Sequence, residues 1–306
     1  MQVSTDKFST IRELYEDIFQ GKHMDQTTCN KEWEAEVNRN KYTWSINSKF
    51  QSILSKITTE ELLKAIRNTK TAGKCPDYDS VHPSVLKMGW PQFHITLMML
   101  FNTILKTAVW PFTNNVVIFL KKPGKKDYMQ TSSYRPITIT SVCGKLLERI
   151  IETRLRAIAE QQRWIPEYQH GFRRDHSTLT YLTPMITELQ HQKASKKCTA
   201  GLFIDLQKAF KSVWHDGMLY RLGKLGFGRQ FLDLITSFLI NRNIKLQVND
   251  YTSQPKPCSI GLPQGSVLSP LICLIYTRDM LDNMEGTQFQ YADDCSVLCS
   301  GPNSTI

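Results

Sequence analysis

Residues Phe289–Leu298, with the sequence FQYADDCSVL, decide the fold of this 306-residue chain. Apolar and aromatic residues lead up to two adjacent aspartates, Asp293 and Asp294, and a second apolar run follows them. This pattern predicts two strands of a hairpin with the carboxylates at or beside the turn. Adjacent aspartates are also common in an ordinary solvated turn, because aspartate bonds its own backbone there. The hairpin alone leaves the role of this pair open.

A third aspartate, Asp205, lies in another strand-like run, Leu202–Leu206. Three carboxylates that meet in one place repel one another, so they need a divalent cation to stay ionised together. If the fold joins Asp205 to Asp293, the chain has a metal site suited to phosphoryl chemistry.

The composition is that of a folded globular protein, with 41% hydrophobic and 22% charged residues, enough for one large domain or two ordinary ones. The net charge of +10 indicates a polyanionic partner, with nucleic acid the leading candidate. The first residues carry no secretory signal, and no apolar run approaches the length of a membrane span. We therefore expect an intracellular protein without a membrane partner; nucleus and cytoplasm are not distinguished, and the oligomeric state stays unknown.

The cysteines are scattered and none has the Cys-x-x-Cys spacing of a zinc or redox motif. They predict free buried thiols in a reducing compartment. The eight positions are Cys29, Cys75, Cys143, Cys198, Cys258, Cys273, Cys295 and Cys299.

A basic turn follows the apolar run Val116–Leu120. It contains Lys121, Lys122, Lys125 and Lys126 around a Pro-Gly pair, and Arg135 opens the next apolar run. Such a turn is usually only a solvated loop, but after a strand it can deliver cations to a phosphate. Lys122 and Arg135 on paired strands could hold a triphosphate, since arginine gives bidentate bonds to phosphate oxygens.

Residues 144–159 predict an amphipathic helix that serves core packing. Its apolar residues face inward, and its charges, among them Glu148, are expected to face out. Further predicted elements are a helix capped by Thr58, helices over 95–105, 208–214 and 231–239, a helix that the Gly261–Pro270 loop opens and that runs to about 281, and a half-exposed strand over 244–248 with a turn at Asn249-Asp250.

Two loops offer binding groups. Gln169–Thr178 is polar and basic, and its histidines His170 and His176 serve either as a catalytic base, as hydrogen-bonded loop residues, or as contacts to a phosphate backbone. Gly261–Pro270 contains Gln264 beside a glycine, which lets the backbone approach a ligand closely; the alternative is a loop that merely caps a buried helix.

These segments, in this order, closely resemble reverse transcriptases, and most of all the polymerases of non-LTR (LINE-like, jockey-type) retrotransposons. The resemblance covers about residues 62–298. It rests on the motifs around Asp205 and Phe210, the Pro-Gln-Gly motif at 263–265, the Tyr-x-Asp-Asp box at 291–294, the finger motifs over 121–136 and the insertion over 169–178.

The resemblance implies two-metal nucleotidyl transfer. Asp205, Asp293 and Asp294 would hold two Mg²⁺ ions, with Mn²⁺ as a possible substitute. The dNTP would be bound by Lys122, Arg135, Phe210, Gln264 and Gly265. Arg173, Arg174 and Tyr291 would contact nucleic acid, and the partners would be an RNA template, a DNA primer and dNTPs.

Phe210 separates this interpretation from an RNA-copying RNA polymerase. A bulky ring beside the incoming sugar would collide with a 2′-hydroxyl, so deoxynucleotides would be favoured by exclusion. Viral RNA polymerases that copy RNA tend to carry an aspartate at the equivalent position, which hydrogen-bonds that hydroxyl.

The implied fold is α+β: the right-hand polymerase fold with fingers and an antiparallel palm sheet backed by helices. We expect a helical, polar lead-in over 1–54, a helical extension of the fingers over 55–100, and the reverse transcriptase domain over 101–306. The chain stops twelve residues after Asp294 (306 − 294), so the thumb is expected to be missing and the chain to be truncated.

Two residues depart from the family pattern: Lys211 stands where an acidic residue is usual, and Asp77 where a loop glycine is common. Together with the expected truncation, these departures leave a catalytically silent nucleic-acid-binding remnant, without productive primer binding, as the main alternative. A two-metal nuclease or integrase is a third reading, which the Pro-Gln-Gly loop and the Lys122/Arg135 pair disfavour because a nuclease has no triphosphate to hold.

Overall fold

The computed structural model describes residues 31–40, 44–71, 77, 80–128, 130, 133–206, 209–240, 242–248, 251–258 and 260–302. Most of the predicted lead-in, Lys208, the Asn249-Asp250 turn, Cys29 and Cys75 lie outside these residues. The chain divides into two compact units, each built from two segments. Unit 1 comprises Met1–Leu155 and Phe210–Ser269, and unit 2 comprises Arg156–Ala209 and Pro270–Ile306.

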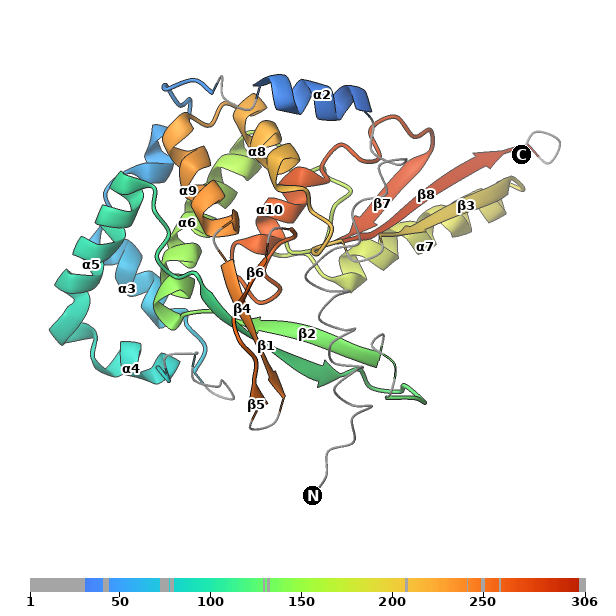
Figure 1. The fold of residues 1–306 in the computed structure, drawn as a ribbon. Coiled ribbons are helices and arrows are strands. Elements are labelled where there is room, and N and C mark those ends of the chain that lie inside the picture. Colours follow the sequence, from blue (N-terminus) through green and yellow to red (C-terminus); the bar gives the residue numbers. More distant parts are fainter. Residues whose placement is uncertain are drawn as a thin grey trace. The chain divides into compact units, whose positions relative to one another are not determined.

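Unit 1 contains a five-stranded mixed sheet in the order β2-β1-β4-β5, with β6 also paired to β4. Its strands are β1 (Asn114–Lys121), β2 (Tyr134–Ile139), β4 (Arg242–Val248), β5 (Tyr251–Thr252) and β6 (Lys256–Cys258). Figure 1 shows β1 and β2 as a long antiparallel hairpin, while β1 and β4 run parallel. In β4 buried and exposed residues alternate, as the sequence predicted, and Ile244 and Leu246 pack against Val117 of β1.

The helix predicted to be capped by Thr58 is confirmed in unit 1 as α3 (Thr59–Arg67), where Thr58 and Glu61 form a reciprocal capping box. The predicted helices 95–105 and 231–239 are also confirmed, as parts of α5 and α9. The elements are α2 (Lys31–Asn40), the short helix η1 (Gln51–Leu54), α3 (Thr59–Arg67), α4 (Pro83–Met88), α5 (Trp90–Thr107), α6 (Val142–Gln161, which continues into unit 2), α8 (His215–Lys224) and α9 (Arg229–Ile240).

Two predicted helices were wrong in extent. Residues 209–214 form turns, and α8 begins only at His215. The Phe210 and Val213 carbonyls there accept from the Leu262 and Gly261 amides of the segment after β6. The helix that the 261–270 loop opens is confirmed as α10 (Ser269–Tyr276), but it ends at Tyr276 and not at about 281, with turns after it.

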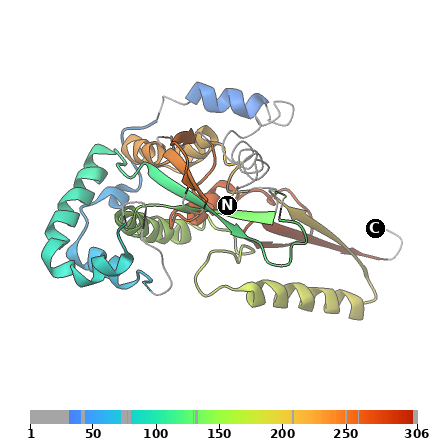
Figure 2. The same cartoon turned by 60° about the horizontal axis from the view of Figure 1, so that its bottom comes forward.

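Unit 2 is a three-stranded antiparallel sheet in the order β3-β8-β7. Its strands are β3 (Cys198–Asp205), β7 (Thr287–Tyr291) and β8 (Asp294–Gly301). Helix α7 (Thr178–Ala194) runs along one face of this sheet (Figure 2), where Met185 packs against Phe289 and Leu298. A second cluster contains Cys295 and Val297. The sheet with its helix places the Asp293-Asp294 turn at one end.

The helix α6 confirms the prediction for 144–159 with one exception. Its apolar residues are buried, but Glu148 is buried with them at 1% exposure and does not face out. Of the described cysteines, all are free, yet Cys198 and Cys299 are exposed, so the expectation of buried thiols was wrong for these two. Within the described residues no helix is both long and apolar enough to cross a membrane.

Candidate active site

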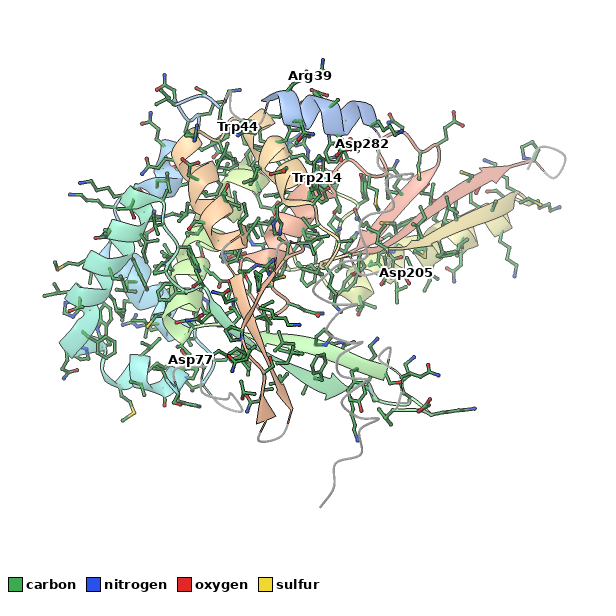
Figure 3. All side chains as sticks on the ribbon, in the orientation of Figure 1. Arg39, Trp44, Asp77, Asp205, Trp214 and Asp282 are labelled. Carbon is green, nitrogen blue, oxygen red and sulfur yellow. The ribbon has the colours of Figure 1, made fainter. Side chains whose placement is uncertain are left out.

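The β3-β8-β7 sheet brings the predicted carboxylates together. Asp205, the last residue of β3, is paired directly with Asp294, the first residue of β8. On its other side Asp294 is paired with Tyr291 of β7, and Asp293 lies in the turn between the two strands. Figure 3 marks Asp205 at the end of its strand. The predicted hairpin with carboxylates at its turn is therefore confirmed, and strand pairing joins Asp205 to Asp294 across 89 residues of sequence (294 − 205).

The electrostatics of Asp294 report this proximity. Burial raises its pKa above the ordinary value, and the carboxylates of Asp293 and Asp205 raise it further. Asp205 and Asp294 are exposed and Asp293 is half-buried, so the oxygens are accessible. In the described part of the chain, no three His, Cys, Asp or Glu side chains are gathered closely enough to enclose a metal ion. The chemistry of the donors, carboxylate oxygens alone, fits a hard divalent cation such as Mg²⁺.

Lys122 and Arg135, predicted to hold a triphosphate, belong to the β1–β2 hairpin of unit 1. Arg135 is paired with Leu120, and the Lys122 amide donates to the Ser133 carbonyl just beyond the last pair. Since strand side chains alternate between faces, Lys122, Leu120 and Arg135 share one face of the hairpin. Arg135 is exposed there, which leaves its guanidinium accessible to a ligand.

The Gln264-Gly265 loop lies against the edge strand β2 of the same hairpin. The Thr138 amide donates to the Gln264 carbonyl at 2.7 Å. Gly265 has a φ of +133°, and a Cβ on it would lie 2.4 Å from the Thr138 carbonyl oxygen. Only glycine fits such a close backbone approach. One backbone bond thus ties the Pro-Gln-Gly loop to the strand that carries Arg135.

Two buried side chains hold the start of this loop. The Gly261 carbonyl accepts from Arg242 Nη2 at 2.6 Å and from His215 Nε2 at 2.8 Å. Burial lowers the pKa of Arg242, and burial, with a smaller effect of Arg242, lowers the pKa of His215 to about 4. His215 is therefore neutral at pH 7 and donates from Nε2. The nearby Leu262 amide donates to the Phe210 carbonyl at 2.6 Å, which adds Phe210 to the same assembly.

Glu148 holds the other end of the loop. Its Oε2 accepts from Ser266 Oγ at 2.5 Å, the Val267 amide at 2.7 Å and the Leu268 amide at 3.3 Å. Burial raises the pKa of Glu148. The sequence contained a signal for this position, because Glu148 follows the buried Gly144 by four residues and precedes the buried Ile151 by three.

Gln264 itself contributes an acceptor without a partner. Its Oε1 is buried and has no hydrogen bond, and the residue lines a small cavity of about 30 Å³ together with Lys211, Thr138 and Arg242. Lys211, the first departure from the family pattern, is thus placed at the Gln264 loop.

The second departure, Asp77, has a structural role (Figure 3). It is 9% exposed, and its two carboxylate oxygens accept from the Val81 amide at 2.9 Å and from the Val142 amide at 2.8 Å. Val142 is the first residue of α6, so Asp77 satisfies an amide that the helix leaves unpaired.

The basic loop of unit 2 contains residues of two kinds. Arg173 is used internally: it pairs with Glu160 at 2.9 Å and donates to the carbonyls of Pro166 and Gln169. Arg174 is exposed, and Tyr291 is half-buried with its ring 5.9 Å from that of Tyr181. Arg174 and Tyr291 therefore stay candidates for nucleic-acid contact.

The histidines of this loop belong to an aromatic group. The ring of His170 lies 5.1 Å from that of His176 and 6.2 Å from that of Tyr181. Burial, then His176, then Arg173 lower the pKa of His170. His170 Nδ1 is also hydrogen-bonded to Thr180 Oγ1, and His176 Nδ1 to the Arg174 carbonyl. This arrangement fits hydrogen-bonded loop residues.

Comparison with known proteins identifies the family of this chain. Residues 120–306 match the family model described as "Reverse transcriptase (RNA-dependent DNA polymerase)". The chain is 33% identical to the probable RNA-directed DNA polymerase from transposon BS of Drosophila melanogaster over 254 residues. This alignment covers 80% of this chain and 28% of that protein. It is 32% identical to the RNA-directed DNA polymerases from mobile element jockey of Drosophila melanogaster, over 80% of this chain and 28% of that protein, and of Drosophila funebris, over 83% and 29%.

The chain spans less than a third of the length of these relatives. The family match nevertheless covers more than half of the chain, and it includes all three aspartates as well as Lys122, Arg135 and Gln264. The chain belongs to the reverse transcriptase family.

Proposed function

We propose that this chain is the polymerase part of a non-LTR retrotransposon protein and copies RNA into DNA by nucleotidyl transfer from a dNTP to a primer 3′-hydroxyl. The observation that carries the proposal is the direct pairing of Asp205 with Asp294 beside the Asp293 turn. The relatives, named as RNA-directed DNA polymerases, support it. The three-stranded sheet of unit 2 would serve as the palm, and the β1–β2 hairpin of unit 1 as part of the fingers.

The three aspartates would hold two Mg²⁺ ions, and Mn²⁺ has the same preference for oxygen ligands. When bound, such ions lower the pKa of the primer hydroxyl and stabilise the leaving pyrophosphate. The protein's contribution is the pairing that keeps Asp205 and Asp294 side by side in spite of their repulsion.

Lys122 and Arg135 would bind the triphosphate from their shared face of the β1–β2 hairpin. Arginine's planar guanidinium bonds two phosphate oxygens at once, whereas lysine acts as a point charge. Gln264 and the Gly265 backbone would line the nucleotide pocket, where the unpaired Gln264 Oε1 can accept a bond from the ligand.

Phe210 would exclude ribonucleotides. Its carbonyl is fixed by the Leu262 amide, so truncation of the ring leaves the backbone anchor in place. Phe210→Ala should therefore raise incorporation of rNTPs relative to dNTPs, measured as the ratio of kcat/KM values. An unchanged ratio would remove the steric role.

The test of the function is primer extension on a poly(rA) template with an oligo(dT) primer, Mg²⁺ and dTTP. The carboxylate variant Asp293→Asn/Asp294→Asn serves as the control, and we expect it to lower kcat by about 1,000-fold or more. Extension that survives in the control would place the chemistry elsewhere. A chain that binds the RNA–DNA hybrid but does not extend the primer would instead be a silent nucleic-acid-binding remnant.

A further inference from the structure

The residue before the aspartate pair has a strained backbone. Ala292 has a φ of +59°, the left-handed region that non-glycine residues seldom adopt. Such a conformation persists only where the surrounding structure holds it. Because Ala292 lies between Tyr291 and Asp293, whatever holds it also sets where the two carboxylates point.

A buried glutamine holds both peptide groups of this residue. The Ala292 amide donates to Gln169 Oε1 at 2.9 Å, and Gln169 Nε2 donates to the Ala292 carbonyl at 3.1 Å. The side-chain amide thus reproduces the pair of bonds that a neighbouring strand would make. Gln169 is 1% exposed, so water does not compete for these bonds.

The surrounding contacts fix the glutamine in turn. The Gly171 amide donates to Gln169 Oε1 at 2.7 Å, and Gln290 Nε2 gives the Ala292 carbonyl a second donor at 3.2 Å. Residues 168–170 run along the edge of β7, where the His170 amide donates to the Gln290 carbonyl. A Cβ on Gly171 would lie 2.1 Å from the Ala292 nitrogen, so the two backbones are in direct contact.

We propose that Gln169 is the positioning residue of the aspartate turn. It holds Ala292 in the left-handed conformation, and through Ala292 it fixes the direction of Asp293 and Asp294. A neutral amide does this without adding charge beside carboxylates that must attract cations. The inference rests on the proposed function for its effect on catalysis, but the clamp itself can be tested without polymerase activity.

The test compares Gln169→Met, which keeps the side-chain length and loses both polar atoms, with Gln162→Met, a matched change at an exposed position of the same unit. Amide hydrogen exchange should become about 10-fold faster at Ala292 and Gly171 in Gln169→Met alone. Mn²⁺ binding, measured by the electron paramagnetic resonance of the free ion, should weaken by about 10-fold. In primer extension kcat should fall by at least as much, with the KM for dTTP within about 2-fold of the parent value.

Amide exchange elsewhere in unit 2 separates the clamp from a general loss of folding, because in Gln169→Met it should stay at the parent rate in α7 and β3. Gln169→Glu keeps the acceptor for the Ala292 and Gly171 amides but loses the donor to the Ala292 carbonyl and buries a charge, so it should not restore their protection to the parent level. The inference is overturned if Gln169→Met leaves both exchange and Mn²⁺ binding unchanged, or if it raises the KM for dTTP while kcat stays constant. A parent chain that fails to extend a primer would instead overturn the proposed function, and the exchange and Mn²⁺ measurements would still decide the role of Gln169.

Discussion

Two loops carry the candidate site residues, the Ala292 turn of unit 2 and the 261–268 loop of unit 1, and different kinds of side chain hold them in place. The Ala292 turn of unit 2 is clamped by the neutral amides of Gln169 and Gln290. The 261–268 loop of unit 1 is held by ionisable side chains: Arg242 and His215 at its start and Glu148 at its end.

The difference follows from what each loop presents. The Ala292 turn carries two carboxylates, and a further buried charge there would shift their affinity for cations. The 261–268 loop presents an uncharged glutamine and a glycine backbone, so ionisable anchors disturb nothing in it. Ionisable anchors make strong hydrogen bonds, but they make the stability of the loop depend on pH. Removing one of them also leaves buried donors without a partner, which lowers stability. We therefore expect the loop of unit 1 to be the more sensitive to pH and to loss of one side chain.

The largest effect is expected at Glu148. Glu148→Ala leaves the Ser266 hydroxyl and the Val267 amide without their acceptor, while the Leu268 amide keeps Ser266 Oγ. This should lower the free energy of unfolding by about 4 kcal/mol. It should also raise the KM for dTTP, since the Gln264 loop loses its C-terminal anchor. Urea denaturation and steady-state primer extension measure the two quantities.

Glu148→Gln is the matched control, because it keeps an acceptor of the same length and should recover more than half of the loss. If Glu148→Ala lowers the free energy of unfolding no more than Gln169→Met does, ionisable anchors do not stabilise their loop more than neutral ones.

Glu148 also marks how far the sequence could predict this site. The aspartate hairpin followed from local pattern, since apolar runs flank Asp293 and Asp294. The pairing of Asp205 with Asp294 did not, because no local signal spans 89 residues (294 − 205); the family resemblance supplied it. Glu148 was predicted to face out with the charges of α6, although its spacing places it on the apolar face; what no local pattern indicated is its partners at 266–268, more than a hundred residues away. No sequence pattern at Gln169 indicated that its side-chain amide would bond the Ala292 amide and carbonyl, as a neighbouring strand would.

The helix predicted over 208–214 was wrong for a related reason. Its composition favours a helix, but its carbonyls bond to the backbone at 261–262, and tertiary contacts override local preference. Positions whose partners are distant in sequence were therefore the ones that sequence reasoning missed.

The second prediction concerns pH and His215. Burial lowers its folded-state pKa to about 4 from an ordinary 6.5, with the Gly261 carbonyl and Asp216 opposing the shift. As pH falls below 6.5 the unfolded chain takes up the proton first, so the folded state loses stability down to about pH 4. Above pH 6.5 the contribution is complete. The loss attributable to this group is about 3 kcal/mol across that window.

His215→Gln, which stays neutral over the whole range, should flatten this part of the stability curve in urea denaturation from pH 7 to 4. His191→Gln, at an exposed position of α7, should leave the curve unchanged. Glu148 contributes with the opposite sign because its pKa is raised, so the comparison must be made between variants and the parent at each pH. Equal slopes for His215→Gln and the parent would show that His215 is not protonated in this window.

The third prediction uses the glycine that each loop requires. A Cβ at Gly171 would meet the Ala292 nitrogen, and one at Gly265 the Thr138 oxygen, both below 2.5 Å and both on backbone. Each alanine variant should lose about 2 kcal/mol of stability. Their kinetics should differ: Gly171→Ala displaces the carboxylates and lowers kcat, whereas Gly265→Ala displaces the nucleotide loop and raises the KM for dTTP.

Gly124→Ala is the control for backbone strain alone. Gly124 has a φ of +76°, but nothing lies within 4 Å of an added Cβ, so the change should cost only about 1 kcal/mol and leave both kinetic constants in place. If Gly171→Ala and Gly265→Ala gave the same kinetic defect, the two loops would not have separate roles.

The smallest effect is expected at Asp77, which extends the ionisable anchoring of unit 1 by one step. Asp77 caps the first amide of α6, the helix that carries Glu148. Asp77→Gly should lower the free energy of unfolding by about 1 kcal/mol, the usual cost of a lost cap, and raise the KM for dTTP only slightly, because Glu148 keeps its own bonds. Asp77→Asn retains an acceptor and should recover most of the stability. If Asp77→Gly instead raised KM as strongly as Glu148→Ala, the loop would depend on the placement of the whole helix, and the Glu148 carboxylate would not be its specific anchor.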